Sequence, residues 1–395
     1  MKIAVNTAKL LRNVPLPDEI ATVHDNAVIA DFGSGTTRIG FSGDDAPRLQ
    51  LPTVFSSSSD GTVETFATAY KQRESHAVQN VVERGLVKNW EGMEHLLNHL
   101  DNLLGISKDP NTPLFLTEAA LVPREQREEL VKILFEKHHA TGVYFGCSPV
   151  LSLYASGRTS GMVLEMGHGS CHTVPVFEGF PLYHSILQMD FGGDDLTSWM
   201  GKQISSHNIT FPAHHQRDIW SYVKELHCPV ASDRSAFTTA VNENNKGDVI
   251  YHTLPDGTVI PLGTERYLPC EAFFDPSLVV FDNPGAPSAG PRRGIHQLAM
   301  DSTRKCDQDV APLLFGNVVL SGGSSLYRGL PDRIHRELQE LAPAEKVRIF
   351  ASTERRNAAF VGASILASLP TFQEMWVTKA DYDEIGPAVA HRNCF

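Results

Sequence analysis

AVIADFGSGTTRIGF, residues 27–41, predicts an apolar strand that ends at Asp31, then a Gly-x-Gly turn and a second apolar strand. MVLEMGHGSCHTVPVF, residues 162–177, repeats the pattern with Glu165 as its acidic residue. The two acidic positions lie 134 residues apart (165 minus 31). Either stretch alone is typical of an ordinary hairpin, but the repetition favours two related domains that share one function.

Both turns suit the binding of a polyphosphate. Glycines beside small hydroxylated residues let backbone N–H groups close around phosphate oxygens. Asp31, at the end of its strand, is well placed to hold the cation that accompanies a polyphosphate. We therefore expect two domains that grip one nucleotide between them.

Composition narrows the class of protein. A chain of 395 residues suits two lobes, and 42% hydrophobic with 20% charged residues is typical of a folded protein. The net charge of −12 disfavours nucleic acid as a partner, because phosphate backbones require basic patches. No apolar run approaches the roughly 20 residues of a membrane helix. The cysteines show no metal-ligand spacing and are expected to be reduced, mostly buried thiols of an intracellular protein; they lie at 147, 171, 228, 270, 306 and 394.

Residues 1 to about 25 precede the first strand. Their basic residues, with no acid before Asp18, faintly resemble a transit peptide. The basic stretch is short and lacks serine, so we expect a flexible or partner-binding N-terminal extension.

Apolar spacing predicts alternating strands and helices of the α/β type. Helices are expected at 90–104, 124–139, 150–156, 194–204, 218–227 and 355–369, and buried strands at 113–117 and 318–320. The glycine-rich residues 321–325 predict a third strand-to-helix turn. A tight hairpin with Asp-Gly at its turn is expected at 254–260, a turn or loop at 56–61, and an irregular loop at 282–291.

Several longer stretches closely resemble conventional actin. They are GFSGDDAPR (40–48), VLSLYASGRT (150–159), SILASL (364–369) and HRNCF (391–395). The similarity runs in order from about Val28 to Phe395, which is more than nine-tenths of the chain.

The resemblance implies the actin fold, in which two α/β lobes close over ATP or ADP with Mg or Ca. Each lobe is expected to hold a five-stranded mixed sheet of ribonuclease H type with flanking helices. The first lobe is expected at 26–160 plus 358–395, with a small inserted subdomain at about 53–87. The second is expected at 161–357, with an insertion at about 201–285. Sugar kinases and heat-shock chaperone ATPases share this architecture and are the alternative if only the glycine-turn motifs are considered.

The same resemblance implies a nucleotide site. Asp31 would hold the divalent cation through water. The nucleotide-binding residues would be Gly33, Ser34, Gly35, Thr36, Arg38, Gly167, His168, Gly169, Ser170, Lys224, Glu225, Gly322, Gly323, Tyr327 and Arg356. Arg38 and Arg356 stand where lysines are usual, which keeps the charge on a bulkier planar group. Taken alone, Lys224 and Glu225 are also typical of a solvated helix face.

The residues that position the attacking water in this family are mostly replaced. Of a glutamine, two aspartates and a histidine, the histidine remains as His172, and the others have become Ser148, Glu165 and His168. Phe32 also replaces a polar residue beside the first turn. Because hydrolysis depends on positioning and electrostatics, we expect slow or absent turnover.

The surfaces used for self-assembly also depart from the family. The finger loop within residues 53–79 is shortened, Arg84 replaces a histidine, and residues 283–291 enlarge the plug loop. One surface is retained, the hydrophobic cleft that receives partner helices. Its residues are Tyr154, Ala155, Gly157, Thr159, Gly179, Leu366, Leu369, Thr371 and Met375. Alternatively, these residues pack the hinge between the lobes.

We therefore expect a divergent actin-like structural or regulatory subunit of a larger cytoskeletal or motor-associated assembly. It would be cytoplasmic and cytoskeletal, the axoneme included, and would bind nucleotide with little or no hydrolysis. Expected partners are proteins that present an amphipathic helix to the cleft, such as actin, motor or other cytoskeletal subunits. A polymerising ATPase actin, a nuclear subunit of a chromatin complex and a small-molecule kinase stay open as alternatives.

Overall fold

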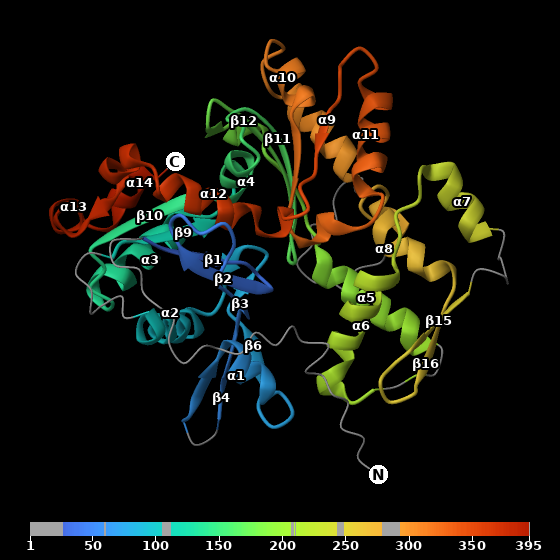
Figure 1. Ribbon diagram of the computed structural model, residues 1–395, viewed down its shortest axis with the longest axis horizontal. Helices are drawn as coiled ribbons and strands as arrows, with labels where there is room; N and C mark the ends of the chain where they lie inside the picture. The colour runs from blue at the N-terminus through green and yellow to red at the C-terminus, as the bar shows by residue number, and fades with distance from the viewer. Residues whose placement is uncertain are drawn as a thin grey trace.

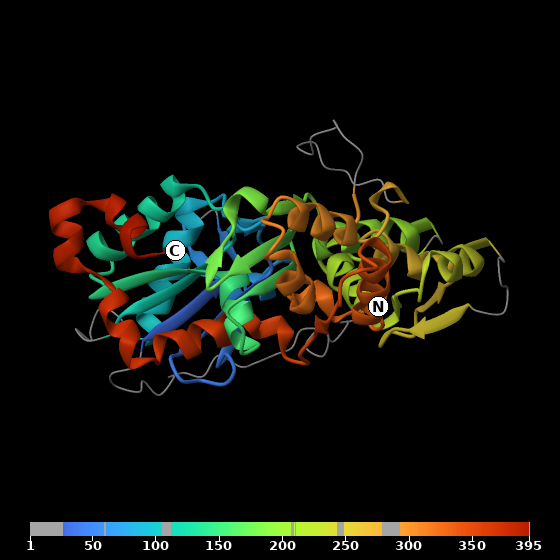
Figure 2. The same cartoon turned by 90° about the horizontal axis from the view of Figure 1, so that it is seen from above.

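The computed structural model describes residues 27–58, 61–104, 112–206, 209, 211–242, 249–278 and 293–394. The N-terminal extension and the 283–291 loop predicted from the sequence lie outside the described residues. Figure 1 shows two halves joined near the middle of the molecule, where α12 (Ala358–Ala367) runs across. Figure 2 shows that the molecule is flat, so both halves are exposed on two broad faces.

The first half is built on a mixed sheet with the strand order β19-β10-β9-β1-β2-β3. The strands β1, β2 and β3 form an antiparallel meander, while β9 and β10 continue the sheet in parallel with β1. The bounds are β1 (Val28–Phe32), β2 (Thr36–Phe41), β3 (Leu49–Pro52), β9 (Leu114–Glu118), β10 (Gly142–Cys147) and β19 (Val377–Thr378). The predicted first hairpin and the predicted strand at 113–117 are confirmed, the latter shifted by one residue.

The second half repeats this arrangement in the order β13-β12-β11-β17-β18. Here β11, β12 and β13 are antiparallel, and β17 and β18 run parallel with β11. Their bounds are β11 (Gly161–Met166), β12 (Cys171–Phe177), β13 (Phe180–Pro181), β14 (Leu187–Met189), β17 (Val318–Ser321) and β18 (Ile349–Phe350). The expectation of five strands per sheet was too low by one, because β19 and β14 add a sixth strand to the respective sheets. Strands of two or three residues are too short to leave an apolar pattern in the sequence.

The predicted helices are present, with shifted ends. α2 (Trp90–Leu104) has the predicted bounds, and α3 (Arg124–Glu136) ends early, shortly before His139 adopts a positive φ of 52°. The closing helix also starts later than predicted, because 355–357 form a 3-10 turn before α12. The other longer helices are α4 (Ser148–Ala155), α5 (Gly193–Ser206), α6 (Ala213–His227), α7 (Arg234–Asn242), α9 (Ile295–Arg304) and α11 (Leu330–Leu341). Shorter ones are α1 (Phe66–Lys71), α8 (Leu268–Glu271), α10 (Ala311–Gly316), α13 (Lys379–Ile385) and α14 (Ala390–Asn393).

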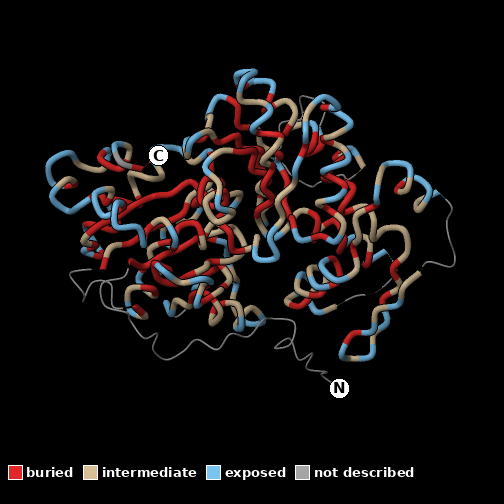
Figure 3. Tube along the Cα trace, turned by 45° about the horizontal axis from the view of Figure 1, so that its top comes forward, coloured by how far each residue is buried: buried red, intermediate tan, exposed pale blue. Residues whose placement is uncertain are grey.

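Each half has its own hydrophobic core. One core draws on residues 27–151 and 360–394, and the other on residues 162–347. The buried segments follow the two sheets in Figure 3. The halves meet where α4 packs on β11 and β17, in a separate cluster that joins Val150 and Leu153 to Val163 and Val319. α4 also packs on α12, so closely that a Cβ at Gly362 would clash with the Leu151 carbonyl. Glycine at 362 is therefore a requirement of this crossing.

The small inserted subdomain contains a very short finger. β4 (Val54–Ser57) and β5 (Val63–Thr65) are joined by a tight turn in which the Ser58 N–H donates to the Thr62 carbonyl (2.9 Å). The turn predicted at 56–61 therefore starts two residues later, because residues 56–57 belong to β4. β6 (Val78–Asn80), β7 (Val82–Glu83) and β8 (Leu86–Val87) complete this subdomain.

Other expectations concern the second insertion, the cysteines and membranes. The predicted Asp-Gly hairpin joins β15 (Ile250–Thr253) to β16 (Val259–Leu262), with Gly257 at φ +87°. All six cysteines are free and buried. Among the helices in the described parts of the chain, none is long and apolar enough to cross a bilayer.

Candidate nucleotide site

A cavity of about 620 Å³ lies between the two halves. Every residue that the sequence analysis assigned to nucleotide, cation or attacking water lines it, from Asp31 and Ser148 to Tyr327 and Arg356. Most of these residues come from the β1–β2 hairpin, the β11–β12 hairpin, α6 and the turn after β17, while Ser148 comes from α4 and Arg356 from the 3-10 turn before α12. Residues far apart in the chain therefore converge on one site.

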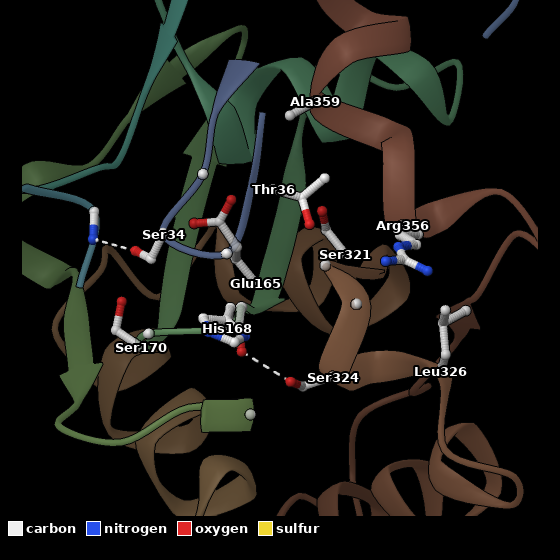
Figure 4. A pocket seen from close by; sticks show the side chains of 18 of the residues that line it. Ser34, Thr36, Glu165, His168, Ser170, Ser321, Ser324, Leu326, Arg356 and Ala359 are labelled. Carbon is white, nitrogen blue, oxygen red and sulfur yellow. Dashed lines mark hydrogen bonds between the residues drawn. The ribbon is translucent and has the colours of Figure 1, made fainter. Parts of the chain in front are cut away.

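The two Gly-x-Gly turns close in the same way and face each other. The Gly33 N–H donates to the Thr36 carbonyl (3.2 Å), and the Gly167 N–H donates to the Ser170 carbonyl (2.9 Å). A Cβ at Gly35 would lie 2.6 Å from Cγ of the His168 ring, so a side chain there would require His168 to move. Figure 4 shows Ser34 on one side of His168 and Ser324 on the other. The repeated pattern thus brings two backbone turns to one cavity.

The third turn packs against the second. Gly322 has a φ of +85°, and a Cβ there would clash with the Met166 carbonyl. The Ser324 hydroxyl donates to the Gly167 carbonyl (2.8 Å; Figure 4). This turn leads into a 3-10 segment at 323–326 rather than directly into a helix, which corrects the sequence prediction.

Asp31 already has partners on both carboxylate oxygens. Arg38 Nη1 lies 2.9 Å from Oδ2, and the Thr117 hydroxyl donates to Oδ1 (2.6 Å). Arg38 Nε donates to the Asn357 side chain (3.0 Å). The guanidinium expected to bind phosphate therefore neutralises the carboxylate expected to attract the cation, so these two assignments compete.

His168 is drawn toward the start of α5. Its Nε2 lies 3.2 Å from Oδ1 of Asp194, which also pairs with Arg217. Burial favours the neutral form of Asp194, but His168 and Arg217 together hold its pKa well below the ordinary range. Since His168 brings no carboxylate and Asp31 is neutralised, the described side chains fit a polyphosphate better than a divalent cation, which prefers several free oxygen ligands.

Two of the residues expected to act on water contact each other. Glu165 and His172 are cross-strand neighbours, and Oε2 of Glu165 lies 3.7 Å from His172 Nδ1. Ser148, the first residue of α4, offers a short hydroxyl from a largely buried position. Gln126 also lines the cavity, but its Oε1 accepts from the Val87 N–H (2.8 Å), so its carbonyl oxygen is already engaged.

The adenosine side differs from expectation at Lys224. This lysine is buried, and its Nζ donates to the Gly193 carbonyl (2.6 Å) and to the Thr197 hydroxyl (2.7 Å). Burial lowers the pKa of Lys224. Two of its three donors therefore anchor α6 to α5, which leaves at most one for a ribose, while Glu225 is exposed.

The cavity wall carries one more base than acid, although the chain as a whole is acidic. Four acids line it (Asp31, Glu118, Glu165 and Glu225) against five bases (Arg38, Lys224, Arg266, Arg328 and Arg356), before any histidine is counted. The whole chain carries −12. The sequence analysis missed two of these bases, Arg266 and Arg328, because nothing in the linear sequence links them to the glycine turns. A wall of this sign attracts anions.

A side chain of the small subdomain ties the two halves together below the cavity. Arg84 Nη1 donates to the Gly169 carbonyl (3.0 Å), and Nη2 pairs with Asp195 (3.0 Å). The neighbouring Gly85 N–H donates to the Ser34 hydroxyl (2.9 Å; Figure 4). Ser34, expected to face phosphate, is therefore partly engaged in holding the turn.

A family model described as Actin matches residues 22–395, essentially the whole chain. The chain belongs to the actin family. Proteins of the actin family generally bind a nucleotide with a divalent cation, and the cavity lies between two α/β halves of this chain. Membership of the family therefore agrees with the observed fold.

Some of the residues assigned to the partner cleft contact one another, and others are exposed. The Gly179 N–H donates to the Thr159 carbonyl (2.7 Å), and the Tyr154 hydroxyl fills the space where a Cβ of Gly179 would stand. Leu366 and Met375 are half-buried against the first core, whereas Leu369 is 43% exposed. Thr371 and Gly157 are exposed, and Ala155 is half-buried. A helix-binding role for these residues stays a prediction.

Proposed function

We propose that this protein is an actin-family subunit that holds an adenine nucleotide as a structural ligand, with little or no hydrolysis. The observation that carries the proposal is the basic cavity, which is framed by two turns with the same backbone closure inside an acidic protein. A ligand that binds only the closed, folded state stabilises that state by mass action. The same strand order in both sheets also supports the ribonuclease H type of each half.

We infer that nucleotide binding here needs no divalent cation. Arg38 neutralises Asp31 at 2.9 Å, and His168 stands where a carboxylate would be required. The charge of Arg38 is balanced by Asp31, but Arg266, Arg328 and Arg356 add further bases to the cavity wall. These bases would screen the phosphate charge that a divalent cation screens elsewhere in the family.

Slow ATP hydrolysis is expected from the residues at the positions that place the attacking water. Ser148 cannot reach as far as a glutamine, and the Glu165 carboxylate faces His172. A phosphate-release assay should give a rate far below that of a conventional actin. Restoring glutamine at 148 and aspartate at 165 and 168 together should raise the rate more than any single reversion, since such groups act as a unit. An ordinary actin rate in the unmodified protein would contradict this proposal.

We further propose a role in a larger cytoskeletal or motor-associated assembly in the cytoplasm, rather than self-polymerisation. The shortened finger, closed by the bond between the Ser58 N–H and the Thr62 carbonyl, offers little surface to a neighbouring subunit, and a head-to-tail contact propagates only when both surfaces fit. A partner helix would occupy the cleft next to Leu369. Leu369→Asp should release that partner. Ile385→Asp is the matched control, because Ile385 is an aliphatic residue of similar exposure (44%), and it should not release the partner. Sedimentation of a robust filament pellet in polymerising salt would favour the alternative of a polymerising actin.

Calorimetric titration with ATP and with ADP, in magnesium and again in EDTA, tests the ligand assignment. We expect binding of similar affinity in both buffers. His168→Asp should introduce magnesium dependence, because it restores a carboxylate, whereas Glu225→Gln should not. Absence of any nucleotide binding would overturn the proposed function, while tight binding in magnesium alone would overturn its cation independence.

A further inference from the structure

The two inserted subdomains meet at a cluster of one carboxylate and two imidazoles. Glu74 follows α1 in the small subdomain, and His214 and His215 lie in the first turn of α6. Glu74 Oε1 lies 3.1 Å from His214 Nε2 and 3.8 Å from His215 Nε2. One ligand atom from each residue lies within 4.8 Å of the others. Among the described residues, this is the one such group that could hold a metal ion.

We propose that Glu74, His214 and His215 bind a zinc ion that bridges the two inserted subdomains. Zinc takes imidazole nitrogen and carboxylate oxygen at about 2.0–2.2 Å, and a tetrahedral site with those bonds separates its ligand atoms by about 3.4 Å. The two carboxylate–imidazole distances bracket that separation. Water fills the fourth position, which faces solvent because Glu74 is 65% exposed.

The two imidazole rings lie close together. The two rings stand 4.1 Å apart at their centroids with a 65° angle between their planes. Adjacent residues in the first turn of a helix thus direct both rings toward the other subdomain.

Arg73 flanks the cluster without opposing the metal, because its own charge is compensated. Its Nη2 pairs with Asp218 (2.7 Å), which the Tyr70 hydroxyl also contacts, and its Nε donates to the His214 carbonyl (2.7 Å). The same Nη2 lies 3.4 Å from His215 Nδ1, the longest of these contacts. A metal on Nε2 leaves the remaining proton on Nδ1, so this long contact opens while the shorter bonds keep Arg73 in place.

The position gives the ion a mechanical role. α6 lines the central cavity through Ser221 and Lys224, and the small subdomain lines it through Val82 and Gly85. A zinc ion that joins the start of α6 to the turn after α1 would hold these two walls at a fixed separation. This role does not depend on whether the cavity holds a nucleotide.

Cobalt(II) titration of the chelator-treated full-length protein tests the site, because four-coordinate cobalt absorbs visible light. We expect about one cobalt ion per chain, displaced by an equal amount of zinc(II). His214→Ala, His215→Ala and Glu74→Gln should each weaken binding at least about tenfold. His252→Ala is the matched control, since His252 belongs to another close histidine pair (3.0 Å to His227) and should leave binding unchanged.

Amide hydrogen exchange gives a second readout. Zinc should slow exchange in residues 66–80 and 213–220 of the unmodified protein and of His252→Ala, and it should have no such effect on His214→Ala. His214 is more exposed than His215, so its variant tests the site even if His215→Ala fails to fold. Failure to bind cobalt or zinc in the unmodified protein would overturn the proposal, as would binding that persists in both Glu74→Gln and His214→Ala.

Discussion

Replacing Arg333 by methionine should strongly destabilise the second half. Arg333 is 1% exposed, and its Nη1 and Nη2 contact the two carboxylate oxygens of Glu271 at 3.1 and 3.0 Å. Its Nε donates to Glu337 (2.6 Å), and its guanidinium lies 4.4 Å from the Phe274 ring centroid. Burial alone would lower the pKa of Arg333, but hydrogen bonds to Glu271 and Glu337 raise it. The pair is therefore buried and bidentate, and the guanidinium keeps its charge.

The magnitude comes from the charge left behind. Methionine fills much of the volume, but Glu271 (1% exposed) would keep only a 3.5 Å contact to Arg234, which is itself half-exposed. Breaking one side of a buried ion pair costs about 3–5 kcal/mol, whereas replacing both partners by apolar residues is often neutral. We therefore expect that loss for Arg333→Met and a recovery of most of it in the double variant Arg333→Met/Glu271→Leu.

Urea unfolding followed by tryptophan fluorescence measures the effect, because Trp199 and Trp220 lie in or against the second core. Arg336→Met is the matched control on the same helix, since its pair with Asp233 is solvent-exposed, and the urea midpoint should barely move. A loss below about 1 kcal/mol for Arg333→Met would refute the reasoning. So would a double variant that is less stable than the single one.

Three further outcomes follow from other contacts. Arg84→Ala removes the bonds to Gly169 and Asp195, so amide hydrogen exchange in residues 82–87 should accelerate. Arg84→Lys should recover part of the protection. Unchanged exchange in Arg84→Ala would show that Arg84 does not hold the two halves together. Gly362→Ala places a Cβ against the Leu151 carbonyl and should lower the thermal midpoint by several degrees, and a midpoint within error of the unmodified protein would show that the α4–α12 crossing can relax. Burial lowers the pKa of His138 below its ordinary value of 6.5. The stability that its neutral ring contributes is therefore present above pH 6.5 and is lost as the pH falls toward the folded-state pKa. The free energy of unfolding should fall by at most about 1.4 kcal/mol per pH unit in this range. Urea midpoints from about pH 7.5 to 5 check this, and His138→Gln should flatten the slope.

The sequence by itself determined the repeat, the family and most of the regular elements. Two acidic-x-Gly-x-Gly patterns predicted two hairpins, and β1–β2 and β11–β12 confirm both. The apolar spacing predicted α2 with its observed bounds. These features could be read because helix and strand periodicity and glycine turns are local properties of the chain, present whether or not it is folded. Strands without a pattern of their own, such as β14 and β19, could not be read.

The tertiary structure alone decided which side chains are free to act. Arg38 and Lys224 were both assigned to the nucleotide from their positions in the sequence, yet one neutralises Asp31 and the other is buried against Gly193 and Thr197. The fold also decided that Glu74 and His214 are neighbours. They are 140 positions apart in the sequence (214 minus 74) and come together only where the two insertions meet. Charge pairing and metal-ligand geometry depend on distances of a few ångströms between distant segments, and only the packing of the folded chain sets those distances.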